Sequence, residues 1–340
     1  MPPPSRLSNA FLTLRFLFLL VPLTAWAGGS NYGIVPGALG QIAGSVSEWP
    51  VPTPEFARDP APAPDGSIYI AVMRGNRIAH FNPKTQAFRE WSLPSGTHPH
   101  GVLVDGDGFV WYTGNGNGAI GRLDPKTGQI AEYRTPSDGD PHTLVLDEKE
   151  GRKGTIWFTM QSAQRIGRLD RTSGKITEYA TSGNPYGIAI DRQGYVWFCR
   201  MAGDKLGRLD PKTGEITDLD TGAGSRPRRM ALGPDGTLWV TAYGDGRLLK
   251  VDPQARRIAK AYAMPAGKRA GPYAVTVDAA GRVWANEIDT DTVAVFDPAN
   301  EKFRVIALPS RNVGIRKAII DAEGHYWYMG SHSGQLGRIQ

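Results

Sequence analysis

The sequence is almost without cysteine, because Cys199 is the only one among its 340 residues. A single cysteine excludes an internal disulfide, so packing must stabilise the fold. Cys199 lies in the segment VWFCR, and similar segments elsewhere in the chain carry Thr113, Thr159 and Thr241 at the same place. We therefore expect a buried strand thiol and not a nucleophile.

Long apolar runs are also missing beyond the first residues. The stretch FLFLLVPLTAWA holds about a dozen apolar residues, whereas roughly 20 are needed to span a bilayer. With Arg6 and Arg15 before it and the small residues Ala25 and Ala27 at its end, it predicts a cleaved secretory signal over residues 1–27. A membrane anchor is the alternative. Cleavage would leave a periplasmic or secreted protein with no stable membrane insertion.

Concentrated runs of positive charge are absent as well. The formal net charge is +6, and it falls to +4 if Arg6 and Arg15 leave with the signal, since residues 1–27 contain no acid. No run of five Lys or Arg occurs, which argues against nucleic acid or a charged membrane surface as a partner. The positive charge can contribute to function only where the fold brings several Lys or Arg side chains together.

What the sequence does contain is a repeat. The segment IGRLDPKTGQIAEY (120–133) returns as IGRLDRTSGKITEY (166–179) and as LGRLDPKTGEITDL (206–219), with weaker copies elsewhere. Each repeat has one aromatic residue in its second predicted strand, at intervals of 40 to 46 residues: Tyr69, Trp111, Trp157, Trp197, Trp239, Trp284 and Trp327. Four short alternating segments per repeat, seven times over, predict an all-β fold, a seven-bladed β-propeller with four-stranded blades.

The two ends of the chain predict how the ring closes. The seventh repeat stops at LGRIQ, its third strand, and the segment SVSEWPVP (45–52) resembles the fourth strands of other repeats. We expect this N-terminal strand to complete the last blade, which removes the exposed edges of an open sheet. We expect residues 28–44 to form a Gly-rich, flexible lead and residues 45–340 to form a single propeller domain.

The loops at one end of the channel are the expected place for a ligand. There the first strand of each blade starts and the second ends, and the residues at these points differ from blade to blade. The candidates for binding a ligand are Arg58, Tyr186, Arg200, Arg228, Tyr273, Glu287 and Arg316. Four arginines and one glutamate give a basic mouth, which suits a small polar or anionic ligand such as a carboxylate, sulfate or phosphate. The alternative is that the arginines pair with carboxylates and plug the channel.

His100 and His142 are the candidate catalytic pair, because they occupy the same position in adjacent blades. Asp140 precedes His142 by two residues. A neutral imidazole near a carboxylate can serve as a general base or as a metal ligand. A hydrogen-bonded histidine without a catalytic role is the alternative, and the spacing matches no fixed metal motif.

The repeat resembles that of the streptogramin B lyase (virginiamycin B lyase) family. The likeness lies in the pattern P-h-G-h-x-h-D-x-x-G-x-h-W-F-T followed by I-G-R-L-D-P-K-T-G-x-I-x-E-Y, and it covers roughly residues 45–340. It is strongest over 99–133, 141–179 and 185–219. The resemblance implies a seven-bladed propeller and a carbon–oxygen lyase that opens a cyclic depsipeptide by elimination, assisted by Mg²⁺.

In that family a histidine removes the proton α to a carbonyl, and carboxylates hold the metal. The matching positions for the histidines here are Tyr273 and Arg316, and those for the carboxylates are Gly314 and Gly330. The nearest similar arrangement is His100, Asp140 and His142. Two functions follow: an exported lyase-like propeller that binds an anionic ligand, with or without ring-opening chemistry, or a non-catalytic envelope propeller that binds a protein or polysaccharide.

Overall fold

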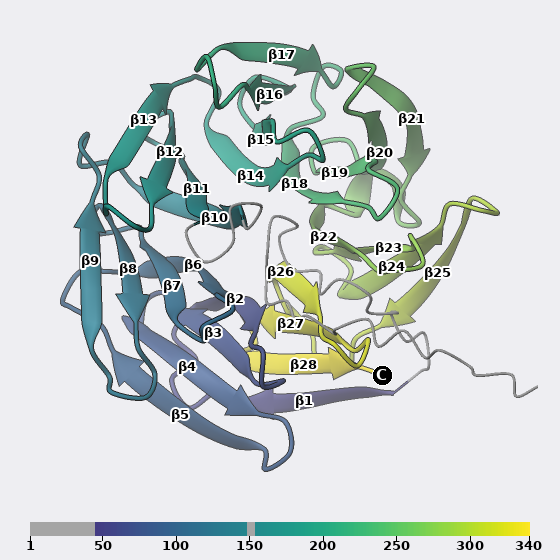
Figure 1. The fold of residues 1–340 in the computed structure, drawn as a ribbon. Coiled ribbons are helices and arrows are strands. Elements are labelled where there is room, and N and C mark those ends of the chain that lie inside the picture. Colours follow the sequence, from purple (N-terminus) through teal and green to yellow (C-terminus); the bar gives the residue numbers. More distant parts are fainter. Residues whose placement is uncertain (1–44, 148–153) are drawn as a thin grey trace, which may run out of the picture.

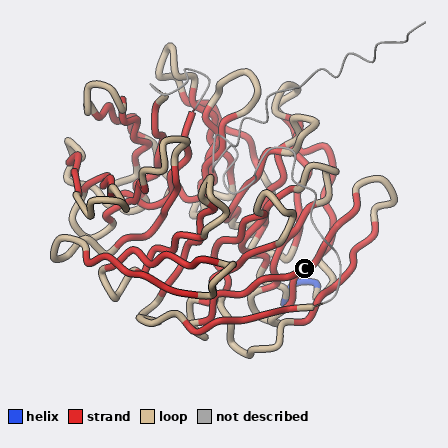
Figure 2. The backbone as a smooth tube through the Cα atoms, turned by 60° about the horizontal axis from the view of Figure 1, so that its bottom comes forward, coloured by secondary structure: helices blue, strands red, loops and turns tan. Residues whose placement is uncertain are grey.

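The structure, a computed structural model, describes residues 45–147 and 154–340. These residues form 28 strands in seven four-stranded antiparallel sheets, which stand as blades around a central axis (Figure 1). The predicted all-β seven-bladed propeller is therefore confirmed. In the described part of the chain, one 3-10 turn, η2 (Gly267–Arg269), interrupts the strands (Figure 2).

The blades are numbered along the chain, and each runs from its innermost to its outermost strand. The first is β2 (Ala57–Pro62), β3 (Ile68–Val72), β4 (Arg77–Asn82) and β5 (Ala87–Ser92). The second is β6 (Pro99–Val104), β7 (Val110–Gly114), β8 (Ala119–Leu123) and β9 (Ile130–Arg134). The third is β10 (Pro141–Asp147), β11 (Thr155–Met160), β12 (Arg165–Asp170) and β13 (Ile176–Ala180).

The fourth blade is β14 (Pro185–Ile190), β15 (Val196–Arg200), β16 (Lys205–Leu209) and β17 (Ile216–Asp220). The fifth is β18 (Pro227–Leu232), β19 (Leu238–Ala242), β20 (Arg247–Asp252) and β21 (Arg257–Ala263). The sixth is β22 (Pro272–Val277), β23 (Val283–Glu287), β24 (Thr292–Asp297) and β25 (Lys302–Ala307). The seventh is β26 (Ile315–Ile320), β27 (Tyr326–Gly330), β28 (Gln335–Ile339) and β1 (Val46–Pro50).

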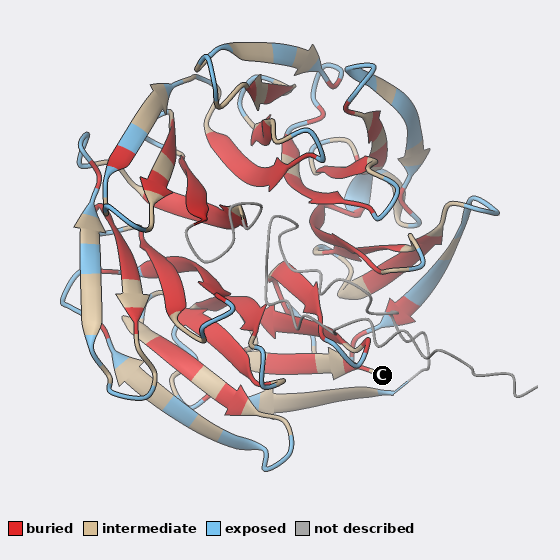
Figure 3. Cartoon of the chain, viewed as in Figure 1, coloured by how far each residue is buried: buried red, intermediate tan, exposed pale blue. Residues whose placement is uncertain are grey.

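Burial decreases from the axis outward. The inner strands are buried along almost their whole length, while the outer strands alternate between exposed and half-buried residues (Figure 3). This gradient follows from stacking blades face to face around a ring, which leaves only the outer strands in contact with water.

The repeated Trp and Asp residues stabilise the blades. In the second blade the buried Trp111 donates its indole N–H to Asp105 at 2.8 Å, and Asp105 also accepts the backbone N–H of Phe109 at 2.9 Å. The pairs Trp197–Asp191, Trp284–Asp278 and Trp327–Asp321 repeat the contact. One carboxylate thus holds a turn and a core side chain together, so these repeated residues are structural.

Ring closure follows the prediction from the chain ends. Strand β1 pairs antiparallel with β28, from Val46 opposite Ile339 to Pro50 opposite Gln335. The ring of Trp49 stacks on Trp327 with centroids 5.7 Å apart, which ties the first described strand to the core of the seventh blade. The outer edge of β28 is therefore covered.

Two predicted segments, the signal over residues 1–27 and the lead over residues 28–44, lie outside the described residues. Within the described part, no helix has the length and apolar character needed to cross a membrane. Cys199 is a free, fully buried thiol on β15, as expected from its place in the repeat.

We expect the closing strand to be essential for stability. A chain that begins at residue 53 lacks β1 and Val51, which is 3 % exposed, and loses the contacts of Trp49. Because a buried large apolar side chain contributes about 1.5–3 kcal/mol, the free energy of unfolding should fall by at least about 3 kcal/mol. Thermal melting against a matched chain that begins at residue 45 measures the effect, and equal midpoints would contradict this account of closure.

Candidate functional site

A bulge at the start of each inner strand shapes the mouth of the channel. In every blade the pairing of the first two strands shifts after the first residue, as between Pro99 and Val102 in the second blade. Two residues of the inner strand then oppose one residue of its neighbour, so the strand bends. A residue with positive φ precedes the strand in six blades: Phe56, His98, Asn184, Arg226, Gly271 and Gly314. The second and third strand positions are thereby placed at the axis.

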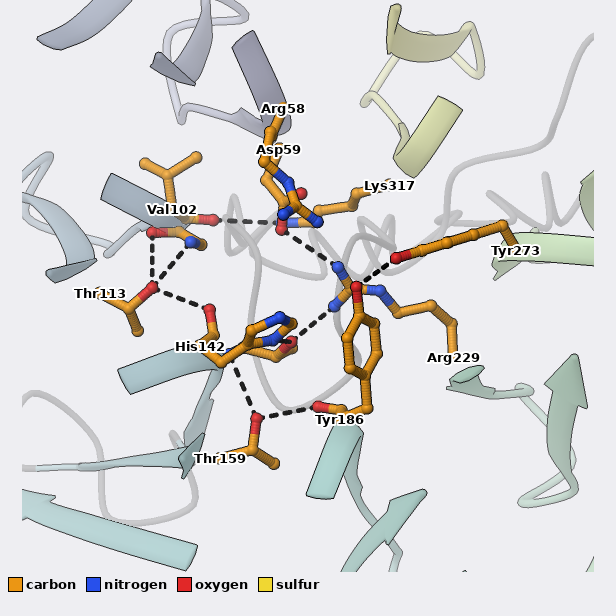
Figure 4. A network of polar contacts seen from close by, with 12 residues as sticks. Arg58, Asp59, Val102, Thr113, His142, Thr159, Tyr186, Arg229, Tyr273 and Lys317 are labelled. Atoms are coloured by element: carbon orange, nitrogen blue, oxygen red, sulfur yellow. Dashed lines mark hydrogen bonds and ion pairs between the residues drawn. The ribbon is translucent and has the colours of Figure 1, made fainter. Parts of the chain in front are cut away.

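Threonines at the ends of the second strands fix these bulges. The hydroxyl of Thr113 accepts the N–H of Gly101 at 2.7 Å and donates to the carbonyl of His142 in the next blade at 2.8 Å (Figure 4). Thr159 and Thr241 make the same bridge to Tyr186 and Tyr273. Three mouth residues, His142, Tyr186 and Tyr273, are thus held by the preceding blade, which explains why the sequence repeats a Thr here.

The side chains at the second strand position meet around the axis. The rings of His100 and His142 have centroids 3.5 Å apart, and His142 lies 4.3 Å from the ring of Tyr186. The hydroxyl of Tyr186 contacts that of Tyr273 across the channel (Figure 4). The guanidinium of Arg228 lies over both phenol rings, at 5.1 and 5.0 Å. The structure therefore brings together the residues that the sequence placed here.

Three arginines of this ring have no carboxylate partner within the described part of the chain. Arg58 is 6 % exposed, and its Nε and Nη2 make no hydrogen bond there. Arg228 and Arg316 are half-buried and contact aromatic rings, those of Tyr243 at 4.4 Å and Phe56 at 5.2 Å respectively. Cation–π contact stabilises a guanidinium but leaves most of its N–H donors free for an anion.

The third strand position adds a second, deeper set of charges. Arg229 contacts Asp59 at 3.6 Å and donates to Thr143 at 2.7 Å, and Lys317 donates to the carbonyl of Val102 at 3.1 Å (Figure 4). Burial, partly offset by Asp59 and reinforced by Arg229, lowers the pKa of Lys317 to about 7.

Sequence reasoning missed this deeper set, although a signal was present. The same position carries small residues in other blades, namely Gly101, Gly187 and Ala274, so Asp59, Arg229 and Lys317 depart from the repeat. A charged residue where the repeat has glycine has no role in blade packing. The difference between charged and small residues at the third position could be read from the sequence as easily as the differences between blades at the second position.

The two histidines are neutral groups in this basic surrounding. Burial, followed by the charge of Arg58, lowers the pKa of both His100 and His142 well below the usual range. His142 contacts Thr143 through Nδ1 at 3.0 Å. Neither ring nitrogen of His100 has a hydrogen-bond partner of normal geometry in the described chain.

Arg200 and Glu287 do not join the ring, contrary to the expectation for the ends of second strands. Arg200 bonds Asp218 and Ser182 at the blade's outer part. Glu287 accepts the N–H of Ala266 at 2.8 Å and the hydroxyl of Thr292 at 2.7 Å. The second strand lies one strand spacing, about 4.8 Å, farther from the axis than the first, so its end residues bond to neighbouring loops.

The carboxylate of Asp140 likewise bonds to a nearby turn. It accepts the N–H groups of Ser162 and Ala163, at 2.8 and 2.9 Å, and so fixes the turn after β11. The carboxylate bonds to this turn, and no bond joins it to His142 in the structure. The predicted His100–Asp140–His142 arrangement is therefore reduced to the two stacked imidazoles.

A cleft of about 950 Å³ lies at the opposite end of the third to fifth blades. Its walls are repeat residues that stack on one another, such as Arg208 over the ring of Tyr195 at 3.2 Å. Because equivalent Arg–aromatic stacks recur in other blades, they are explained by packing. The unpaired arginines point to the mouth as the site.

Comparison with known proteins identifies the family. A sequence profile of the virginiamycin B lyase family matches residues 149–340, more than half of the chain. The chain belongs to the virginiamycin B lyase family. No curated protein sequence matches it at a significant level.

Solved structures show the same fold at low identity. Virginiamycin B lyase from Staphylococcus aureus matches with a TM-score of 0.78 and 23% identity, covering 87% of this chain and 99% of that one. A streptogramin B lyase matches with a TM-score of 0.78 and 22% identity over 86% and 96%. Hydrazine synthase from Kuenenia stuttgartiensis matches with 0.69 and 15% over 88% and 99%. At these identities the likeness concerns the fold.

The residues at the mouth do not fit the Mg²⁺ that the virginiamycin B lyase family implies. Mg²⁺ prefers carboxylate and water oxygens, whereas Asp59 is the one carboxylate in the described network and contacts Arg229. The resemblance matches Gly314 and Gly330 to the family's acids, and a side chain at either position would require a neighbour to move. A Cβ on Gly314 would lie 2.6 Å from His332, and one on Gly330 would lie 2.9 Å from Val313.

We expect stability to decrease in acid because of the two histidines. Their pKa values are lowered in the folded state, so below about pH 6.5 the unfolded chain takes up protons that the folded chain does not. The free energy of unfolding should fall by up to about 1.4 kcal/mol per pH unit for each histidine. Denaturant unfolding between neutral pH and pH 5 should show a smaller loss in His142→Gln. The exposed His98 provides the control His98→Gln, and an equal loss in His142→Gln and wild type would refute the assignment.

Proposed function

We propose that the propeller binds a small anionic ligand, a carboxylate, sulfate or phosphate, at the mouth of its channel. One observation carries this proposal: Arg58, Arg228 and Arg316 converge on the axis and none forms an ion pair with a described residue. Buried cations that lack a partner are costly, and a ligand anion would stabilise them. Guanidinium groups bind such anions through paired hydrogen bonds.

The walls of the site indicate the rest of the ligand. Phe56, Tyr186, Tyr243 and Tyr273 surround the guanidinium groups of Arg228 and Arg316. Aromatic rings beside charged groups favour a ligand with an apolar or planar part next to its acidic group. The proposal is therefore an organic anion in preference to a free inorganic one.

Export is part of the same proposal. The apolar stretch and arginines of residues 1–27 support passage out of the cytoplasm, which would place the propeller in the periplasm or outside the cell. The ligands would then be molecules of the envelope or the medium. Binding at the mouth, rather than turnover, is the role that the described side chains support.

Replacing Arg228 should weaken anion binding selectively. Loss of one charge-assisted contact of this kind costs about 1.5–3 kcal/mol, so Arg228→Gln should bind sulfate or succinate at least about tenfold more weakly than wild type. Titration calorimetry of the mature protein measures this. Arg200→Gln is the matched control, because Arg200 bonds Asp218 outside the ring and its loss should change affinity less than about twofold.

Two results would contradict the proposal. Equal affinities of wild type and Arg228→Gln would show that the ring does not hold the anion. A larger effect of Arg200→Gln would place the anion at the periphery of the fourth blade. In both cases the melting temperature of each variant must match wild type, so that misfolding is not read as lost binding.

Ring opening of a streptogramin B depsipeptide is not expected. The positions that carry the family's histidines and acids hold Tyr273, Arg316, Gly314 and Gly330, and the mouth does not fit Mg²⁺. Chromatography of the depsipeptide after incubation with the protein and Mg²⁺, with EDTA as the control, should show the intact ring. Elimination leaves the mass unchanged, so separation must precede mass detection. A Mg²⁺-dependent linear product would show that the activity is carried by other residues.

A further inference from the structure

The deep part of the mouth holds more positive than negative charge. Arg58, Arg229 and Lys317 are at most 6 % exposed, and the carboxylate of Asp59 contacts Arg229 among them. Lys317 relieves part of the excess, since its pKa is about 7. Two guanidiniums still face one carboxylate, with Arg228 close by. Because buried net charge is unfavourable, a further anion is needed when no ligand is bound.

Tyr186 is placed to supply that anion. Its ring is 4 % exposed and lies between the guanidiniums of Arg229, at 4.9 Å, and Arg228, at 5.1 Å. Its hydroxyl meets that of Tyr273. When two phenols share one hydrogen, one oxygen donates it and the other oxygen accepts it. The accepting oxygen is the one that can carry the negative charge.

The charges around the pair decide which phenol ionises. Burial alone would raise the pKa of Tyr186, but Arg58, Arg229 and Arg228 outweigh it and lower the pKa to about 8. Burial and the charge of Tyr186 raise the pKa of Tyr273. The groups that face Tyr186 come from five inner strands: Arg58 and Asp59 on β2, His142 on β10, Arg228 and Arg229 on β18, Tyr273 on β22 and, through the network, Lys317 on β26.

We propose that Tyr186 is the internal counter-ion of this site: in mildly alkaline solution it is a phenolate in the free protein, and it takes up one proton when an anion binds among Arg58, Arg228 and Arg316. The proton comes from solvent and forms the O–H bond of the phenol, and no electron is transferred. This coupling rests on the proposed anion binding, but the ionisation of Tyr186 does not. It also makes Tyr186, and not His100 or His142, the strongest base of the ring.

Ultraviolet absorbance tests the phenolate without any ligand. In a pH titration of the mature protein, one of its tyrosines should ionise near pH 8, well before the others. The early component should be lost in Tyr186→Phe and kept in Tyr273→Phe. Tyr133→Phe on the outer strand β9 is the matched control and should also keep it. Absence of an early component in the wild type, or its persistence in folded Tyr186→Phe, would overturn the proposal.

Calorimetry with sulfate tests the coupling. One pH unit above the Tyr186 pKa, binding measured in buffers of different ionisation enthalpy should show uptake of nearly one proton in wild type and less in Tyr186→Phe. Wild-type affinity should fall about tenfold per pH unit above that pKa, and the affinity of Tyr186→Phe should depend less on pH.

The two proposals fail in different ways. If sulfate binds without proton uptake, the coupling is wrong while anion binding stands. If no anion binds but the early phenolate appears, the proposed function and the coupling fail, and Tyr186 remains the counter-ion. If sulfate binds and no early phenolate exists, the assignment of Tyr186 is wrong.

Discussion

The pairing of β1 with β28 is the constraint on which the rest of the molecule depends. It joins residues 46–50 to residues 335–339 and makes a ring of what would otherwise be a row of seven sheets. Only a closed ring directs all seven inner strands toward one axis. The mouth, with side chains from blades that are distant in sequence, is a consequence of that closure. Its chemistry therefore depends on a strand that contributes no residue to it.

A second feature, the bulge at the start of each inner strand, places side chains at the mouth of the closed ring. Each inner strand begins with a bulge, and Thr113, Thr159 and Thr241 bind the bulge of one blade to the backbone of the next. His142, Tyr186 and Tyr273 are therefore held by two blades at once. These hydrogen bonds keep the aromatic residues of the mouth in place. The guanidiniums of Arg228 and Arg229 are stabilised by contact with the ring of Tyr186.

Membership of the virginiamycin B lyase family and the content of the mouth point in different directions. The family repeat consists of the Trp, Asp, Gly and Thr residues that build the blades, so a match to it indicates the fold. The mouth positions do not take part in blade packing, so their residues can change without loss of the propeller. In this chain they hold arginines, tyrosines and histidines. The proposed anion site rests on these residues and not on the family repeat.

The sequence by itself determined the architecture. A period of 40 to 46 residues and the orphan strand at 45–52 were enough to predict seven four-stranded blades and the way they close, because repeated turns and core residues encode local structure directly. It also identified the second position of the inner strands, where His100, His142, Tyr186 and Tyr273 meet. These positions stood out because their residues differ from blade to blade while the rest of the repeat stays the same.

The tertiary structure decided which candidates belong together. Arg200, Glu287 and Asp140 had the right place along the chain, but each lies beside a closer partner, Asp218, Thr292 or a turn N–H. The deeper charges Asp59, Arg229 and Lys317 became visible as a network only when three distant blades met at the axis. Which partner a polar side chain binds depends on distances across the ring, and these are set by closure and strand spacing, which no local pattern records.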